Sequence, residues 1–282
     1  METAAPAADE RIIVFFSPAL LSTAMELSAK GLRVLVTAGG SGIGRVIAET
    51  FTKAGARVHI SDLEEKFLAQ AKRSLPGVSQ TLGDVAKLAD VDRLFDEVQR
   101  SLGGLDVLVN NAGVAGPTAK VEDIRPEDWE RTIAVDLNGM FYCTRKAMPM
   151  LKRAGGGSII NLSSIAGRLA FPMRTPYSAA KWAVVGFTQS LAAEAGPDRV
   201  RVNCIQPGIV EGERVERIIS AKAQALGVSS DEVLAQMVEG VSLKTTVTAQ
   251  DVANTALFLA SEAGRHISGQ AISVCGGVRY LV

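Results

Sequence analysis

Three side chains between residues 164 and 181 could together perform acid–base chemistry on a hydroxyl or carbonyl group. Tyr177 and Lys181 are four residues apart, so on a helix they lie on one face and one turn apart. A neighbouring ammonium stabilises a phenolate, which would let a tyrosine exchange protons near neutral pH. Ser164 follows the apolar run 158–162, and its hydroxyl could polarise a carbonyl oxygen in the same cleft. A surface Tyr-Lys pair is the alternative interpretation of the spacing alone.

A glycine-rich segment, Thr37-Ala-Gly-Gly-Ser-Gly-Ile-Gly44, could bind the pyrophosphate of a dinucleotide. Its glycines let the backbone approach a pyrophosphate closely, and the following helix offers unpaired N–H groups and the positive end of its dipole. The segment lacks the G-x-G-x-x-G spacing because Arg45 follows Gly44, and a glycine-rich turn without a ligand is the alternative. The residues expected to contact the cofactor here are Thr37, Gly39, Ser41, Gly42, Ile43 and Gly44.

Asp62 follows the second predicted strand, eighteen residues after Gly44. A carboxylate near this offset can accept hydrogen bonds from both hydroxyls of an adenosine ribose, and it repels a 2′-phosphate. Position 41 is a serine and no basic residue follows Asp62 before Lys66, so NAD is expected as the cofactor rather than NADP. Asp62 could also cap the next helix, and one carboxylate could serve both purposes.

Short β-branched runs alternate with longer amphipathic stretches from residue 32 onward. This pattern predicts an α/β fold, a doubly wound parallel sheet with helices on both faces. Strands are predicted at 32–37, 57–61, 79–82, 106–110, 157–162, 200–205 and 271–274, and helices at about 42–55, 64–74, 88–102, 125–153, 175–195 and 249–260. Residues 32–282 are expected to form a single dinucleotide-binding catalytic domain, with a substrate lid of one or two helices at about 208–247.

Residues 1–31 fit this pattern poorly and are expected to be an N-terminal extension. The apolar run 11–25 is broken by Pro18 and is shorter than the ~20 residues that span a bilayer. We expect a mobile tail or an over-extended start, with Met25 beginning the functional chain. A signal peptide is the alternative, but the acidic pair Asp9 and Glu10 is wrong for its n-region.

The composition excludes several classes of function. The 282 residues include 30 Lys and Arg and 30 Asp and Glu, so neither nucleic acid nor a membrane is expected as a partner. Three dispersed cysteines and two histidines argue against a disulfide framework, a metal site and a Ser-His-Asp hydrolase. His59, in an alternating run, is interpreted as a plain strand residue. The expected partner is a small-molecule substrate, and the expected location is the reducing cytoplasm.

Over residues 32–281 the chain resembles the compact group of the short-chain dehydrogenase/reductase family. The glycine-rich segment is similar to the family's TGxxxGIG motif, 110–113 to its NNAG motif, and 202–208 to its VN-x-x-x-PG turn. Ser164 lies thirteen residues before Tyr177, as in the family. The resemblance implies a Rossmann fold with a seven-stranded sheet, Tyr177 as acid/base, Lys181 on the nicotinamide ribose, and a homodimer or homotetramer. It adds these cofactor contacts: Asp84, Val85, Asn111, Ala112, Gly113, Pro207, Gly208, Ile209 and Val210.

Three residues depart from the family pattern. Ala38 replaces the first glycine of the motif, and we expect neighbouring Gly39 and Gly40 to relax the turn. Asp136 stands where the family has a catalytic Asn that anchors a water, and its charge would disfavour a nearby phenolate; pointing away from the site is the alternative. Gly212 replaces a Thr that holds the carboxamide, so backbone groups near 209–210 would have to replace it.

The expected function is therefore NAD-dependent hydride transfer between the nicotinamide and a small polar secondary alcohol or sugar, or the corresponding ketone or lactone. The alternative is an NAD-binding sensor or scaffold protein with little turnover, suggested by the three departures. Charged residues expected around the cleft mouth favour a small polar substrate, although they could equally form a solvated rim or an oligomer contact: Arg168, Arg174, Glu211, Glu213 and Arg214.

Overall fold

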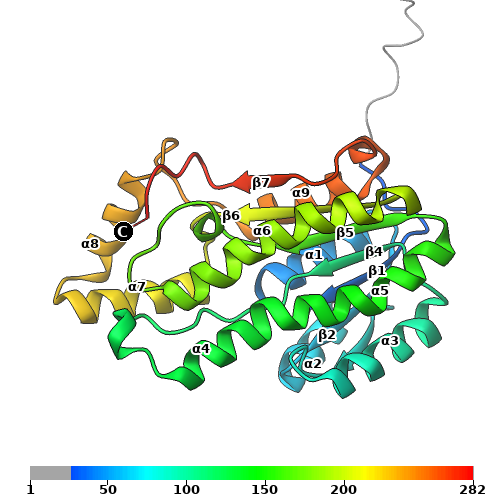
Figure 1. The fold of residues 1–282 in the computed structure, drawn as a ribbon, viewed down its shortest axis with the longest axis horizontal. Helices are drawn as coiled ribbons and strands as arrows, with labels where there is room; N and C mark the ends of the chain where they lie inside the picture. Colours follow the sequence, from blue (N-terminus) through cyan, green and yellow to red (C-terminus); the bar gives the residue numbers. More distant parts are fainter. Residues whose placement is uncertain (1–26, 282) are drawn as a thin grey trace, which may run out of the picture.

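The computed structural model describes residues 27–281, apart from the side chain of Arg214, so the expectation for residues 1–31 lies almost wholly outside the described residues. The described chain forms one seven-stranded parallel sheet between two layers of helices, as predicted (Figure 1). The strands are β1 (Arg33–Thr37), β2 (Arg57–Asp62), β3 (Ser79–Leu82), β4 (Val107–Asn110), β5 (Gly157–Leu162), β6 (Val200–Pro207) and β7 (Ala271–Val274). Every predicted strand is confirmed within two residues at either end.

The strand order, β3-β2-β1-β4-β5-β6-β7, reverses between β1 and β4. All six neighbouring pairs are parallel, so the carboxyl ends of the strands meet at one edge of the sheet. A crevice at such a reversal is where doubly wound sheets bind ligands, because the connecting loops diverge to opposite faces there. This topology therefore positions the loops after β1, β4 and β5 for a shared site.

The two faces of the sheet are covered by different helices. Their bounds are α1 (Gly42–Lys53), α2 (Glu65–Ser74), α3 (Leu88–Leu102), α4 (Pro126–Ile133), α5 (Met140–Ala154), α6 (Thr175–Ala195), α7 (Glu213–Leu226), α8 (Ser230–Glu239) and α9 (Ala249–Ala260). One core cluster packs apolar residues of α1, α2 and α9 against the sheet, and a second packs those of α3, α5 and α6 against the other face. Burial on both faces explains the nearly continuous apolar strands.

The prediction of one continuous α-helix over 125–153 is wrong, because a π-helix interrupts it. The chain forms α4, then a π-helix η3 (Ala134–Gly139), and then α5. The wider turn places Val135, Asp136 and Gly139 in the interior. A Cβ at Gly139 would lie 2.7 Å from the Val85 side chain, so the segment needs a glycine there. Sequence periodicity does not distinguish one π turn from an α-helix, and such turns often occur at functional sites.

The excursion after β6 contains two helices, α7 and α8, outside the sheet, as expected (Figure 1). They pack on each other through the buried residues Ile219, Ala223 and Val233. A bridge between Val210 and Val247 closes the base of the excursion. The pair of helices is thus anchored at its stem.

His59 is a buried hydrogen-bonding residue of β2, with 1% of its surface exposed. Its Nδ1 lies 2.8 Å from the Ser79 hydroxyl, and its Nε2 lies 2.9 Å from the Thr81 hydroxyl. Burial lowers the pKa of His59 from 6.5 to about 4, because the interior disfavours the imidazolium. The histidine is therefore neutral in the folded protein, which agrees with its interpretation as a strand residue.

This burial predicts an acid-sensitive fold. Between pH 6.5 and 4 the unfolded chain binds a proton at His59 that the folded chain does not. Stability is therefore full above about pH 6.5 and falls toward pH 4, by about 3 kcal/mol for this group. Urea unfolding at several pH values measures the slope. His59→Gln should flatten it and the exposed control His266→Gln should not; equal slopes in the two variants would contradict the assignment.

Candidate active site

Helix α6 presents Tyr177 and Lys181 on one face near its amino end. The Lys181 ammonium lies 5.5 Å from the centre of the Tyr177 ring. Lys181 is 4% exposed, and its Nζ donates a hydrogen bond of 3.1 Å to the carbonyl oxygen of Leu162 at the end of β5. Tyr177 is half-buried. The ammonium thus links α6 to the carboxyl edge of the sheet beside the phenol.

Ser164 begins the tight turn that follows β5. Its Oγ accepts a hydrogen bond of 3.1 Å from the N–H of Ala166, in the short helix η4 (Ile165–Gly167). The preceding Ser163 donates from Oγ to the carbonyl of Lys181 at 2.8 Å, and Gly167 approaches the same carbonyl too closely for a Cβ. The turn that carries Ser164 is therefore fixed against α6 at Lys181.

Asp136 points into the site. Its Oδ1 accepts a hydrogen bond of 2.6 Å from the N–H of Val114, and its Oδ2 lies 3.2 Å from the Lys181 ammonium. Asp136 is 2% exposed. Asn138, two residues further on, is exposed, so its amide does not take the place of the family's Asn in the site. The alternative that Asp136 points away is wrong, because the π-helix turns this carboxylate inward. A buried ion pair occupies the place that family resemblance assigns to an Asn.

The turn after β1 keeps a left-handed residue at Ala38, with φ of 50°. Gly39 and Gly40, which we expected to relax this turn, leave Ala38 in the left-handed conformation. The Asn111 amide donates to the carbonyls of Thr37 at 3.0 Å and Ala38 at 3.1 Å, which holds the turn in place. A non-glycine residue in this conformation costs about 1–2 kcal/mol.

Thr37, the last residue of β1, ties the loop after β4 to β1. Its hydroxyl oxygen accepts hydrogen bonds from the N–H groups of Asn111 and Ala112, both at 3.0 Å. Gly113 continues this loop, and a Cβ there would lie 3.3 Å from Lys181 Nζ and 3.4 Å from Asp136 Oδ1. The loop after β4 thus reaches from the glycine-rich turn to the Lys181–Asp136 pair.

The amino end of α1 leaves room for an anion. Ser41 precedes the helix without forming a side-chain cap hydrogen bond, and a Cβ at Gly42 would meet nothing within 4 Å. Gly42 has φ of 52°, a conformation that glycine favours, while Gly44 is too close to the Ala38 carbonyl for a Cβ. Open space before uncapped N–H groups fits a pyrophosphate.

Asp62, at the end of β2, lies beside this turn. Its Oδ2 accepts from the N–H of Gly40 and its Oδ1 from the N–H of Glu64, both at 3.1 Å. Burial raises the pKa of Asp62, and the backbone hydrogen bonds oppose that shift. Asp62 therefore stabilises the turn before α2 but does not cap that helix, whose N-cap residue is Glu64.

The end of β3 contributes Asp84 and Val85. One Asp84 oxygen accepts from the N–H of Ala86 at 2.9 Å, and the other pairs with Arg131 of α4 at 3.0 Å. Val85 is 8% exposed and packs against Gly139. These contacts connect the loop after β3 to α4 and to the π-helix.

The segment after β6 has part of its backbone already engaged. Gly208 donates to the Val274 carbonyl, and the Ile209 carbonyl accepts from Val247, both at 2.9 Å. These two hydrogen bonds attach the segment to β7 and to Val247 at the stem of the excursion. Gly212 has φ of 128°, so a threonine at this position would be strained.

Arg174 differs most from its expected place at the rim of the cleft, because it is 2% exposed. Its guanidinium carbon lies 5.4 Å from the centre of the Tyr177 ring, and NH2 donates to the Ala115 carbonyl at 2.5 Å. Arg168, Glu211 and Glu213 are exposed, as a rim requires. No sequence signal distinguished Arg174 from these exposed residues.

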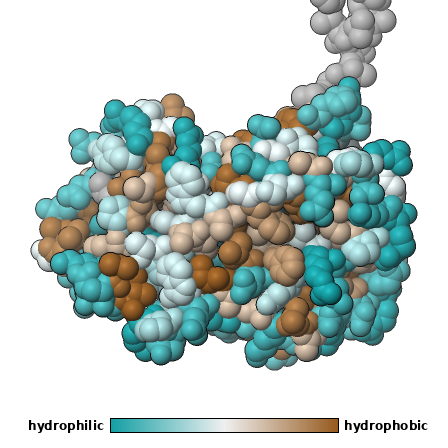
Figure 2. Space-filling model, viewed as in Figure 1, coloured by the Kyte–Doolittle hydropathy of each residue, from teal (hydrophilic) through white to brown (hydrophobic). Residues whose placement is uncertain are grey.

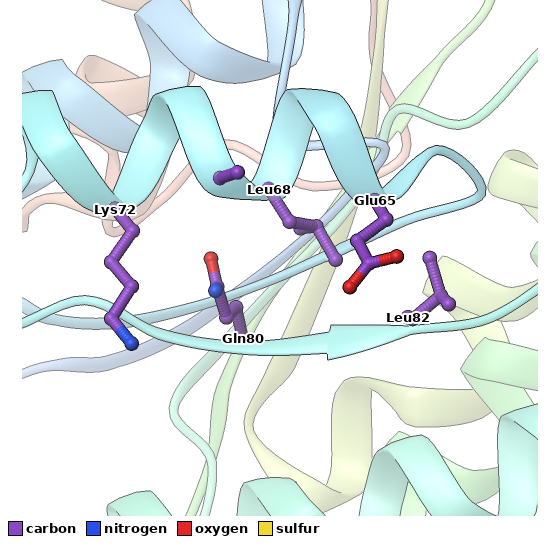
Figure 3. Close-up of a pocket in the computed structure, with 6 residues that line it drawn as sticks. Glu65, Leu68, Lys72, Gln80 and Leu82 are labelled. Atoms are coloured by element: carbon purple, nitrogen blue, oxygen red, sulfur yellow. The ribbon is translucent and has the colours of Figure 1, made fainter.

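A separate pocket of about 350 Å³ lies between α2 and the edge strand β3 (Figure 3). Its lining residues are Glu65, Leu68, Ala69, Lys72, Gln80 and Leu82. None of them is a predicted site residue, and three strands lie between β3 and β5 in the sheet. This pocket is not part of the site around Tyr177.

Within residues 27–281 no cluster of His, Cys, Asp and Glu could hold a metal, and no helix could cross a membrane.

A doubly wound sheet with a glycine-rich turn after its first strand and a Ser-Tyr-Lys set is the architecture of a dinucleotide-dependent oxidoreductase. The sequence model described as "Enoyl-(Acyl carrier protein) reductase" matches residues 37–279. The chain is 37% identical over 250 residues to a probable galactose dehydrogenase of Rhizobium meliloti, covering 87% of this chain and 94% of that protein. The chain belongs to the short-chain dehydrogenase/reductase family, and it is an enzyme acting on CH–OH groups.

Two solved structures have the same fold. An NAD+-bound xylitol dehydrogenase superposes with a TM-score of 0.83 at 26% identity, covering 88% of this chain and 99% of that one. A polyketide ketoreductase with NADPH superposes with a TM-score of 0.85 at 29% identity, covering 89% and 98%. Both contain a nicotinamide cofactor. The NADPH of the ketoreductase carries a 2′-phosphate that the NAD+ of the xylitol dehydrogenase lacks.

Proposed function

We propose that this enzyme uses NAD to interconvert a small polar secondary alcohol or sugar and the corresponding ketone or lactone, with Tyr177 as the acid/base. The observation that carries the proposal is the Lys181 ammonium, 5.5 Å from the Tyr177 ring centre and anchored at the end of β5. When bound, the nicotinamide exchanges a hydride with the substrate carbon.

The proposed roles follow from position. Tyr177 moves the proton of the substrate oxygen, and the Lys181 cation stabilises its phenolate form. Ser164, fixed against α6, donates a hydrogen bond to the same oxygen. The uncapped start of α1 and the open space at Gly42 fit a pyrophosphate, so the residues named above along 37–44, 84–85, 111–113 and 207–210 are proposed to line the cofactor cleft.

A sensor or scaffold with little turnover is the second candidate, favoured by the buried Asp136–Lys181 pair. The two candidates differ in one assay. Purified protein with NAD is mixed with a panel of secondary alcohols and sugars, and the absorbance of reduced nicotinamide is followed. Sustained turnover supports the enzyme, and binding of NAD without turnover on any substrate supports the sensor.

The choice of NAD is tested by Asp62→Ala. The carboxylate, 6% exposed beside Gly40, would accept hydrogen bonds from the ribose hydroxyls and repel a 2′-phosphate. Its loss should weaken NAD binding on the order of 10- to 100-fold, as charge-assisted hydrogen bonds are worth ~1.5–3 kcal/mol, and NADP should lose less or gain. Titration calorimetry measures both affinities. More efficient use of NADP than of NAD by the unmodified enzyme would contradict this reading of Asp62.

Asp136→Asn tests the departure at the centre of the site. The carboxylate, 3.2 Å from the Lys181 ammonium, offsets part of the positive charge that favours the Tyr177 phenolate. The Asn keeps an acceptor for the Val114 N–H and removes the charge. The rate of alcohol oxidation should therefore rise at a lower pH in the variant. Initial rates measured across pH decide the matter, and an unchanged profile would show that the ion pair does not influence proton exchange.

We also propose a homodimer or homotetramer. Phe141 of α5 and Trp182 of α6 are 45% and 52% exposed, and apolar surface gathers over the face formed by α4, α5 and α6 (Figure 2). Exposed aromatic side chains of this size are typical of interfaces.

The three cysteines are free and buried, which is consistent with the proposed cytoplasmic location. Residues 32–282 are proposed as one catalytic domain, with 208–247 as its substrate lid.

A further inference from the structure

The ring of Tyr177 has a buried cation on each side of it along the chain. Arg174 precedes Tyr177 by three residues and Lys181 follows it by four, so one cation lies a helical turn before the phenol and the other a turn after it. The Arg174 guanidinium carbon is 5.4 Å from the centre of the Tyr177 ring and 5.3 Å from that of Phe171. Arg174 is 2% exposed, so its charge acts on the phenol with little screening by solvent.

The surrounding backbone fixes Arg174 in this place. Arg174 is the N-cap residue of α6, and Met173 before it has φ of 62°, a conformation that is unfavourable for a non-glycine residue. The Met173 carbonyl accepts a hydrogen bond of 3.0 Å from the N–H of Ala119. The guanidinium donates to the Ala115 carbonyl at 2.5 Å and to the Thr118 hydroxyl at 3.4 Å. The loop after β4 therefore holds this cation, and strain of this kind occurs often at functional sites.

The buried charges of the site show what a second cation adds. Among the residues that the structure describes, three buried charged side chains lie around Tyr177: Asp136, Lys181 and Arg174. The Asp136 carboxylate is 3.2 Å from the Lys181 ammonium, so the two formal charges cancel as a pair. One negative and two positive charges leave a single net positive charge, and it comes from Arg174. An opposite charge within ~4–6 Å favours the ionised form of a group, here the phenolate.

Other charged groups around this part of α6 are paired, exposed or positive. The short helix η4 has no charged residue, and the charged residues of α4 are ion-paired or exposed. Arg168, Glu211 and Glu213 are exposed at the rim. On α7, the pKa of the half-buried Lys222 is lowered by burial and then by the charge of Arg174. Exposed charges act weakly because water and salt screen them, so they do not replace Arg174.

We propose that Arg174 is a positioning residue for proton exchange, and that its buried guanidinium supplies the positive charge that favours the Tyr177 phenolate where Asp136 offsets that of Lys181. This inference rests on the proposed function, because it takes Tyr177 as the acid/base. It explains how the site accommodates a carboxylate where family resemblance places an Asn. A guanidinium suits this role, since it stays protonated at every pH at which the protein is folded.

The pH dependence of alcohol oxidation tests the charge of Arg174. Initial rates are measured across pH with NAD and the compound of the panel above that is turned over fastest. In Arg174→Met the rising limb should move to higher pH by at least about one unit. Arg174→Lys keeps the charge, so its limb should stay near that of the unmodified enzyme. Arg57→Met is the matched control, since Arg57 is an exposed cation at the start of β2, at the opposite edge of the sheet.

The double variant Arg174→Met with Asp136→Asn distinguishes the charge from a purely structural role. It leaves Lys181 as the buried charge beside the phenol, so the site again has a single net positive charge. Its rising limb should therefore return toward that of the unmodified enzyme, whereas an amide at position 136 does not restore the hydrogen bonds to Ala115 and Thr118. A limb that stays shifted in the double variant would overturn the proposal, as would an unshifted limb in Arg174→Met or an equal shift in Arg174→Lys.

A titration without cofactor or substrate separates this proposal from the proposed function. The chain has three tyrosines, so the ultraviolet absorbance of tyrosinate, minus that of Tyr177→Phe, follows the ionisation of Tyr177 alone. Ionisation at higher pH in Arg174→Met than in the unmodified protein supports the charge role even if no compound is turned over, while equal titrations overturn it. Arg174→Gln keeps an N–H donor for the Ala115 carbonyl without the charge, so it replaces Arg174→Met if that variant does not fold.

Discussion

Tyr177→Phe is expected to reduce turnover roughly 100- to 10,000-fold while leaving NAD affinity near that of the unmodified enzyme. The substitution keeps the aromatic ring, which packs against the Arg174 guanidinium at 5.4 Å and the Lys181 ammonium at 5.5 Å. It removes only the hydroxyl that is proposed to exchange a proton with the substrate. Steady-state rates together with an NAD titration distinguish loss of proton transfer from loss of cofactor binding.

Tyr142→Phe is the matched control for this experiment. Tyr142 is a half-buried tyrosine of α5 whose ring lies 5.7 Å from that of Phe141. Loss of its hydroxyl should leave turnover within about twofold, since surface-side substitutions rarely change more than ~0.5 kcal/mol. Retention of more than a few per cent of turnover in Tyr177→Phe would remove this tyrosine from the mechanism.

The fold could be predicted from the sequence because its elements have strong local signals. Strands buried on both faces are short β-branched runs, and each is followed by an amphipathic stretch long enough for a crossover helix. The helix predicted over 175–195 has the bounds of α6, which begins at Thr175 with Pro176 in its first turn. Periodicity failed only where the hydrogen-bond pattern changes without a change in sequence pattern, at the π-helix η3.

The candidate site could be predicted only in part. Motif spacing identifies Tyr177 and Lys181, since four residues on a helix fix their relation. The direction of Asp136 depends on one wider turn, and Arg174 is held by hydrogen bonds to Ala115 and Thr118 in the loop after β4. Those contacts join segments far apart in the chain. No local pattern encodes them, so a rim residue and a buried residue look alike in the sequence.

Because position 136 holds an Asp rather than an Asn, the stability of this site depends on the ion pair between Lys181 and Asp136. Both side chains are almost fully buried, at 5% and 0% exposure, so each charge relies on the other in the folded protein. Removing one partner of a buried pair leaves an uncompensated charge. A loss of activity in a Lys181 variant therefore has two possible sources, chemistry and stability, and a single substitution does not separate them.

Lys181→Met is accordingly expected to have two effects. Unfolding free energy should fall by about 3–5 kcal/mol, because Asp136 is left buried without its cation. Turnover should fall at least 100-fold and NAD affinity should fall as well, because the ammonium is proposed to stabilise the Tyr177 phenolate and to bind the ribose. Urea unfolding, steady-state kinetics and NAD titration measure the three quantities separately.

The double variant Lys181→Met with Asp136→Asn separates the two sources of the loss. It removes both charges and keeps an acceptor for the Val114 N–H, which Asp136 accepts at 2.6 Å. Stability should recover most of the loss, since neither charge is then buried alone. Turnover should remain low, because the ammonium that is proposed to bind the ribose beside Tyr177 is still missing. If turnover recovered together with stability, Lys181 would serve only to neutralise Asp136, and its proposed roles toward the phenolate and the ribose would be wrong.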